Sequence, residues 1–243
     1  MRTNKLEYND FLELKWKNTA APLSEEKARA LLTGMAGAGK IPAYANTLTT
    51  GLSSRRVKEA LFREWGVHDI ESARHILGWL ETEGSRELYR RYRPFISSSA
   101  TAQECRRKAV LAYSEEACHE YIILPFACSV HSLYHCMEKM GRHPEFAFTA
   151  DTLPSDILAW DMSRLILFVR LCLDCGYMGE QEAWEHILRA GGCIWRPDVS
   201  VRRFLMECLA GCAFCHYGDG QRFEECLSLA EKWSLIHNEA SIV

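Results

Sequence analysis

The sequence lacks an uninterrupted hydrophobic run long enough to cross a lipid bilayer. Its most apolar stretch, residues 157–173, is interrupted by Asp161, Arg164 and Arg170, and charges at the centre of a bilayer are costly. The N-terminal residues alternate charged and apolar side chains, so the apolar core of a secretory signal is also missing. These absences predict a soluble cytoplasmic protein that does not bind membranes.

The sequence also lacks an excess of charge of one sign. It has 29 Lys and Arg against 32 Asp and Glu, a net charge of −3. No basic stripe is present for nucleic acid, and no acidic block is present for a cationic partner. We therefore expect no nucleic-acid partner.

Cysteine, by contrast, is abundant, with eleven residues in 243. An odd number and the absence of an export signal argue against a disulfide framework. Most of these cysteines lie beside Leu, Phe or Ala in helical patterns, where a free thiol packs as a small hydrophobic group. We expect a reducing compartment.

No run of alternating Val, Ile or Thr predicts a β-strand, and helical periodicity dominates. Ser24 can cap a first helix. Residues 53–66 and 69–84 predict a helical hairpin, in which Gly66 ends the first helix and Asp69 caps the second. The buried stripe of the second helix is expected to contain Ile70, Ala73, Ile76, Leu77 and Leu80.

The second half of the chain predicts more helices around a buried one. Residues 86–121 form a polar helical stretch with a break at Pro94 and the following serines, and Pro125 predicts a kink or boundary. Residues 155–176 are apolar on nearly every side, which indicates a central buried helix. Further helices are expected from Gly179 and over 199–217 and 221–236. The prediction is a compact all-α bundle, with residues 1–52 as an N-terminal extension and 53–236 as the domain.

Two segments resemble a known family. Residues 63–89 contain Trp65-Gly66-Val67, Leu77-Gly78-Trp79-Leu80 and Glu83-Gly84. Residues 159–184 contain Trp160-Asp161, Arg164, Arg170, Gly176-Tyr177, Glu180, Glu182 and Ala183-Trp184, and residues 204–214 resemble the family's closing helix. Over residues 55–217 the chain resembles the bacterial YbeU-like group, domain-of-unknown-function family 1266. The resemblance implies an all-helical bacterial cytoplasmic protein and an association with toxin–immunity neighbourhoods, but no reaction.

Asp161 and Arg164 are the most informative charged pair. Residues three apart share a helix face, so their side chains can meet within an apolar helix. One interpretation is a structural ion pair that ties this helix to Tyr177 or Glu182. The alternative is an enzyme, a hydrolase or transferase, that uses Asp161, Arg164, Glu180 and Glu182 in a catalytic site.

Two cysteine pairs are candidate zinc ligands or redox groups. Cys172 and Cys175, and Cys212 and Cys215, have the spacing of zinc ligands. Both pairs lie in predicted helices, whereas structural zinc sites usually use turns. We therefore predict no cofactor and keep a zinc or redox regulator as an alternative.

Two other patterns do not predict catalysis. Gly34 to Lys40 approximates a phosphate loop, but Ile41 replaces the hydroxyl residue that would hold magnesium. Cys118 and His119 are adjacent on a helical pattern, so their side chains diverge by about 100°. The sequence therefore favours a non-catalytic protein that binds a protein partner, plausibly an immunity-type or effector-associated factor for a toxin or effector.

Large side chains are the candidates for structural or interaction roles. Tryptophans anchor helix crossings, and a groove lined by two of them could hold a partner. The candidates are Trp65, Trp79, Trp160, Arg170, Tyr177 and Trp184.

We expect every cysteine to be a free thiol in the folded protein. Titration of the denatured protein without reductant should find close to eleven thiols. A native disulfide between Cys172 and Cys175, or between Cys212 and Cys215, would contradict this expectation.

Overall fold

The computed structural model describes residues 17, 23–37, 41, 43–116, 120–147, 149–216 and 220–240, without the side chains of 113–116, 120–128, 233 and 235–240. These residues contain ten helices and no β-strand, which confirms the predicted all-α class. The helices are α1 (Glu25–Met35), α2 (Ser54–Trp65), α3 (Ile70–Thr82), α4 (Gly84–Ser97), α5 (Ala102–Glu116), α6 (Glu120–Met140), α7 (Leu158–Asp174), α8 (Glu180–Ile194), α9 (Val201–Cys215) and α10 (Gly220–Ala240).

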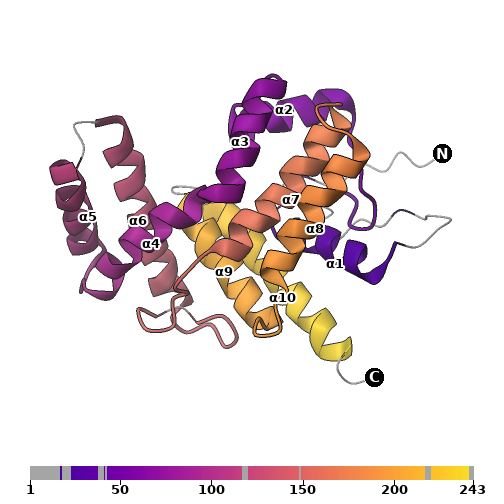
Figure 1. Cartoon of the computed structure of the whole chain (residues 1–243). Coiled ribbons are helices and arrows are strands. Elements are labelled where there is room, and N and C mark those ends of the chain that lie inside the picture. Colours follow the sequence, from indigo (N-terminus) through magenta and orange to yellow (C-terminus); the bar gives the residue numbers. More distant parts are fainter. Residues whose placement is uncertain are drawn as a thin grey trace, which may run out of the picture.

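Helix α7 is the centre of the bundle (Figure 1). It packs against α1, α2, α3, α4, α8 and α9. All its residues from Ala159 to Cys172 are buried except Arg164, so a near-continuous apolar helix has no solvent face. Helix α1, which lies in the predicted N-terminal extension, packs on both α7 and α8 and so shares this core.

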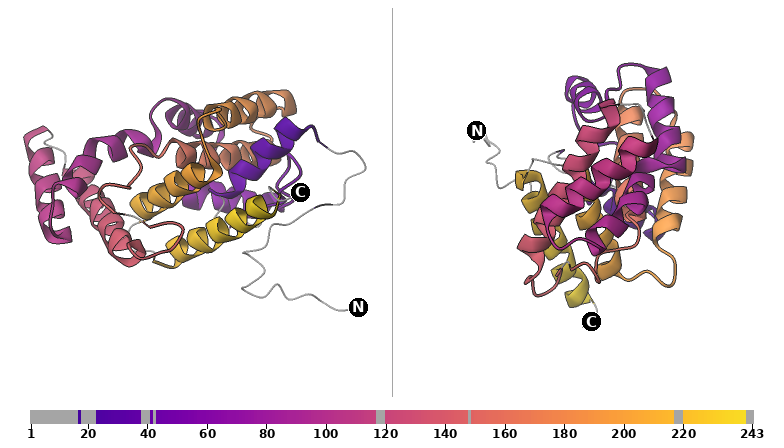
Figure 2. Two further views of the ribbon diagram at one scale, coloured as in Figure 1. Left: turned by 90° about the horizontal axis from the view of Figure 1, so that it is seen from below. Right: turned by 90° about the vertical axis from the view of Figure 1, so that its left-hand side faces the viewer.

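Helices α5 and α6 form a pair at one end of the molecule (Figure 2). They pack on each other, and α4 and α9 connect them to the rest of the bundle. Helix α10 packs on α9. This arrangement leaves α2 at the edge of the bundle, with α7 as the main helix beneath it.

The hairpin of α2 and α3 forms for the local reasons that the sequence indicates. Gly66 ends α2 in the left-handed conformation, with φ of 67°, which glycine adopts without strain. Asp69 accepts a hydrogen bond from the Ser72 backbone, and the Ser72 side chain accepts one from the Asp69 backbone. This reciprocal cap starts α3 at Ile70, with four residues between it and the end of α2.

Some local predictions were wrong. The predicted break after α4 lies at the serines that follow Ser97 and not at Pro94, which is inside the helix, and α6 has no boundary at Pro125. Ile70 is 44% exposed, because it is the first residue of α3 and precedes the part of the helix that packs on α7. Ala73, Leu77 and Leu80 are buried as expected.

Nine cysteines lie in the part of the chain whose side chains are described, and all nine are free thiols. Cys118, Cys128 and the side chain of His119 lie outside that part. No helix among the described residues is both long enough and apolar enough to cross a membrane.

Gly211 provides a test of the packing between α7 and α9. A Cβ atom at this position would overlap the Cβ and Cγ of Trp160, so Gly211→Ala should destabilise the fold by about 1–3 kcal/mol. Gly192 in α8 is the matched control, because a Cβ there meets no atom within 4 Å. Thermal unfolding should show a lower Tm for Gly211→Ala and an unchanged or higher Tm for Gly192→Ala. Equal stability of the two variants would contradict this packing.

Candidate functional site

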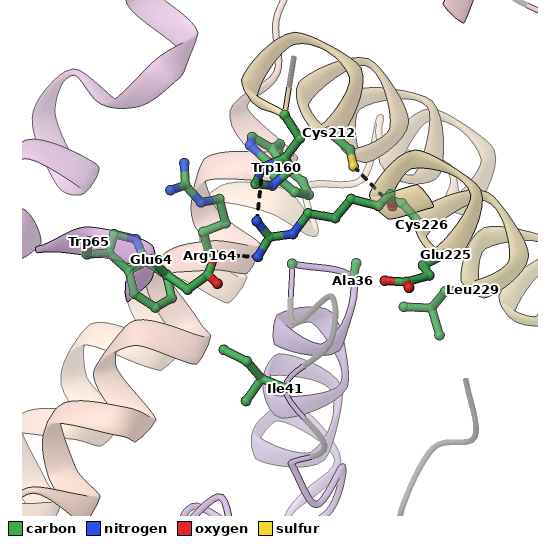
Figure 3. A pocket seen from close by; sticks show the side chains of 13 residues that line it. Ala36, Ile41, Glu64, Trp65, Trp160, Arg164, Cys212, Glu225, Cys226 and Leu229 are labelled. Carbon is green, nitrogen blue, oxygen red and sulfur yellow. Dashed lines mark hydrogen bonds and ion pairs between the residues drawn. The ribbon is translucent and has the colours of Figure 1, made fainter. Parts of the chain in front are cut away.

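A pocket lies between α2, α7, α9, α10 and the turn that follows α1 (Figure 3). Its empty space is about 590 Å³, including the opening to solvent. Ala36, Ile41 and Leu229 give it an apolar wall. Its aromatic and polar lining includes Trp65, Trp160, Arg164, Cys212, His216 and Arg222.

Arg164 is held between two indole rings. Its guanidinium carbon lies 5.8 Å from the ring centroid of Trp65 and 5.7 Å from that of Trp160, within the range of cation–π attraction. Its only hydrogen bond in the described part of the chain is from Nη1 to Ser85 Oγ, at 3.4 Å. No carboxylate among the described residues lies within ion-pair distance of it, so most of its five donors have no protein acceptor.

Arg222 forms a bridge across the same pocket. Its Nη2 pairs with Glu64 Oε2, and its Nη1 lies 3.3 Å from His216 Nδ1. Burial opposes ionisation of Glu64, yet the hydrogen bonds and charges of Arg222 and Arg63 outweigh it and lower the pKa of that carboxyl. The bridge therefore joins α2 to α10 through two charged side chains.

The Cys212 thiol in the pocket is a poor nucleophile. Cys212 donates to the Arg222 carbonyl oxygen at 3.7 Å. A hydrogen bond with Cys226 is the largest cause, and burial the second, of the rise in the pKa of Cys212 well above its ordinary value. Since the thiolate is the reactive form, Cys212 is inert at neutral pH.

Asp161 does not pair with Arg164, so the predicted ion pair within α7 was wrong. Its carboxylate accepts from the backbone amides of Ser85 and Arg86, at 3.1 and 2.9 Å, and from Arg86 Nη1 at 3.1 Å. Burial raises the pKa of Asp161, while the charge of Arg164 and the bonds from Arg86 and Ser85 oppose the rise. Asp161 thus caps the first turn of α4. The pair was predicted to connect α7 to Tyr177 or Glu182, whereas Asp161 connects α7 to α4.

Arg170 is fully buried and organises the loop before α2. Its Nε donates to the Leu48 carbonyl at 3.1 Å, and its Nη2 donates to the carbonyls of Tyr44, Thr47 and Thr49. Burial lowers the pKa of Arg170 to about 10, which leaves it protonated at neutral pH. Its Nη1 lies 3.6 Å from the Met35 sulfur, so its donors are directed to backbone carbonyls and this sulfur and not to the pocket.

The residues of the enzyme alternative do not meet. Glu180 and Glu182 are exposed in the first turn of α8, beyond the C-terminal end of α7. Asp161 lies in the first turn of α7, and the helix rises roughly 20 Å between Asp161 and Asp174. One substrate cannot contact all four residues at hydrogen-bond distance.

The two cysteine pairs are also separated. Cys172 and Cys175 lie at the C-terminal end of α7. Cys215 lies at the end of α9 next to His216, whose ring contacts Trp160 near the start of α7, with centroids 5.6 Å apart. Because a tetrahedral site needs all ligands within about 2.3 Å of one ion, the pairs cannot share a zinc ion. Among the described residues, no group of three or more His, Cys, Asp or Glu side chains could hold a metal ion.

The other candidate residues have packing roles. Trp79 packs at the edge of the core. Trp184 is buried beneath Lys27, whose Nζ lies 4.4 Å from the ring centroid. The Tyr177 hydroxyl donates to the His68 carbonyl at 3.3 Å and joins the α7–α8 turn to the α2–α3 turn. Of the four candidate tryptophans, Trp65 and Trp160 both line the pocket.

Sequence reasoning missed Glu64, Arg86 and Arg222. Glu64 and Arg222 are separated by 158 positions, and Arg86 and Asp161 by 75. No periodic pattern connects residues so far apart. A Cβ at Gly84, whose φ is +61°, would overlap the Asp161 carboxylate, a close approach that only the folded structure shows. The Cys118–His119 pair and the Gly39 and Lys40 positions of the approximate phosphate loop lie outside the described residues.

We expect Asp161→Ala to destabilise the fold severely. The substitution leaves the Arg86 guanidinium, 6% exposed, without its carboxylate and removes the cap of α4. Breaking such a buried pair typically costs about 3–5 kcal/mol. Denaturant unfolding should measure this loss, and Asp198→Ala is the control because the Asp198 side chain is 64% exposed. An unchanged midpoint for Asp161→Ala would contradict the structural role.

The comparisons with known proteins identify a family whose function is unknown. No curated protein matches the chain, and no solved structure matches it. The family model described as "Protein of unknown function (DUF1266)" matches residues 60–238. That match spans helices from α2 to α10, including every helix that contributes a side chain to the pocket. The chain therefore belongs to the DUF1266 family.

Proposed function

We propose that this chain is a non-catalytic binding protein that recognises a protein partner. The recognition surface consists of the pocket and of Phe62, which lies beside it on α2. The form of this function that we propose is an immunity-type or effector-associated role in the bacterial cytoplasm, with a toxin or effector as the partner.

The exposure of Phe62 is the observation that supports a protein partner. Its side chain is 66% exposed, although most phenylalanines are buried. Phe62 lies three residues before Trp65, so the two side chains project from neighbouring parts of the same helix face. An aromatic pocket with an exposed apolar side chain at its edge fits the anchor-and-rim organisation of protein interfaces.

The chemistry of the pocket supports binding over turnover. The Cys212 thiol is protonated, and the Glu64 carboxylate is paired with Arg222. Arg164 and Arg222 are permanent cations, which hold anions well but do not transfer protons at neutral pH. These groups are suited to recognition.

We expect Phe62→Ser to abolish capture of the partner from the native host. Leu111→Ser is the matched control, because Leu111 is 58% exposed but lies on α5, in the helix pair at the other end of the molecule. Both variants should fold as well as the parent, since each removes an exposed apolar group.

Quantitative mass spectrometry of co-purified proteins should measure the difference. A protein recovered with the parent and with Leu111→Ser, and reduced at least tenfold with Phe62→Ser, is the expected result. Equal recovery with all three proteins would contradict the recognition surface.

A further inference from the structure

We propose that the pocket binds a carboxylate of the partner, carried on a short apolar stem as in a glutamate side chain, with Arg164 as the anchoring cation. This inference deepens the proposed function and rests on it for the source of the carboxylate. The chemistry of the site can be tested separately.

The first reason for this proposal is that the Arg164 guanidinium has few hydrogen-bond acceptors around it. The guanidinium is partly buried and flanked by Trp65 and Trp160, yet it makes one hydrogen bond, at the long distance of 3.4 Å. A buried charge usually has an oppositely charged partner. The Nε1–H of Trp65 is also buried and has no acceptor in the described part of the chain. The guanidinium is a cation and a hydrogen-bond donor, so the missing ligand is an anionic acceptor.

The acidic residues next to Arg164 are engaged elsewhere. Asp161, one turn before it, caps α4 and pairs with Arg86. Glu64, next to Trp65, pairs with Arg222. Neither carboxylate lies within ion-pair distance of Arg164, so an external anion would not have to displace an existing salt bridge.

The surrounding charges favour a single negative charge. Glu64 and Asp161 are each paired with one arginine, so the single charge of Arg164 is matched by a single negative charge. Glu225 also lines the pocket, and its carboxylate repels a dianion such as phosphate more than a carboxylate. Planar geometry adds to this preference, because a guanidinium can hold the two oxygens of a carboxylate with two parallel bonds.

The apolar wall supports the short stem. Ala36, Ile41 and Leu229 line the same cavity (Figure 3). A Cβ at Gly37 would overlap the backbone of Ser163 and Arg164, so the turn after α1 lies directly on α7 and narrows the pocket beside Arg164. Methylene groups can contact this wall while the carboxylate reaches the guanidinium.

The test uses butyrate, which has the carbon skeleton of a glutamate side chain together with its Cα, with butyramide as its uncharged analogue and inorganic phosphate as the dianion. Indole N–H resonances of ¹⁵N-labelled protein report binding, and Trp65→Phe identifies the resonance of Trp65. Butyrate should shift this resonance with a dissociation constant on the order of millimolar, as expected for a ligand with so few atoms. Butyramide should leave it unchanged, and phosphate should bind at least tenfold more weakly.

Two variants connect the shift to Arg164. Arg164→Gln should weaken butyrate binding at least tenfold, whereas Arg189→Gln should not change it, because the Arg189 side chain is 62% exposed on α8. If Arg164→Gln does not fold, the comparison of butyrate with butyramide on the parent protein still decides the result. Equal shifts from butyrate and butyramide, tighter binding of phosphate, or no shift with butyrate would each overturn the carboxylate site.

The outcomes for the two proposals are distinguishable. If butyrate fails to bind while Phe62→Ser still abolishes partner capture, the carboxylate inference is wrong and the recognition surface stands. If butyrate binds through Arg164 while Phe62→Ser captures the partner normally, the carboxylate site stands for a small ligand, and both the recognition surface and the partner as source of the carboxylate are wrong.

Discussion

The burial of α7 on all sides is the constraint on which the rest of the structure depends. A helix with charged residues and no solvent face must provide each charge with a partner inside the protein. Asp161 accepts from the first turn of α4, Arg170 donates to carbonyls of the loop 44–49, and Asp174 accepts from the Thr50 backbone and hydroxyl. The charges of α7 thus determine where α4 begins and how the loop before α2 folds.

The same constraint explains why Arg164 differs from its neighbours on α7. Its guanidinium lies between two aromatic rings and is not directed at a helix end or a loop. Cation–π contacts stabilise the charge without using the N–H groups, which lie in the plane of the guanidinium. The cation is therefore held in place while its donors remain available, and this combination makes the position suitable for recognition.

Local sequence signals predicted the elements but not the connections between them. Asp69 and Gly66 define the α2–α3 hairpin through contacts within a few residues, and the apolar character of 157–173 was sufficient to identify the buried helix. Asp161 and Arg164 were selected on that helix as a pair, but each has other partners in the structure. Their partners are Arg86 from α4, the Trp65 ring from α2 and the Trp160 ring from the preceding turn of α7, and the contacts between helices depend on how the helices cross.

Helix α2 connects the two parts of the recognition surface. It carries Phe62 on its exposed side and Glu64 and Trp65 at the pocket. Its main packing is on α7, and the Glu64–Arg222 bridge attaches it to α10. The Trp65 indole beside Arg164 also packs against Phe168 of α7, with ring centroids 5.3 Å apart. Because Phe62 and Trp65 are three residues apart on α2, the recognition surface depends on the position of one short helix.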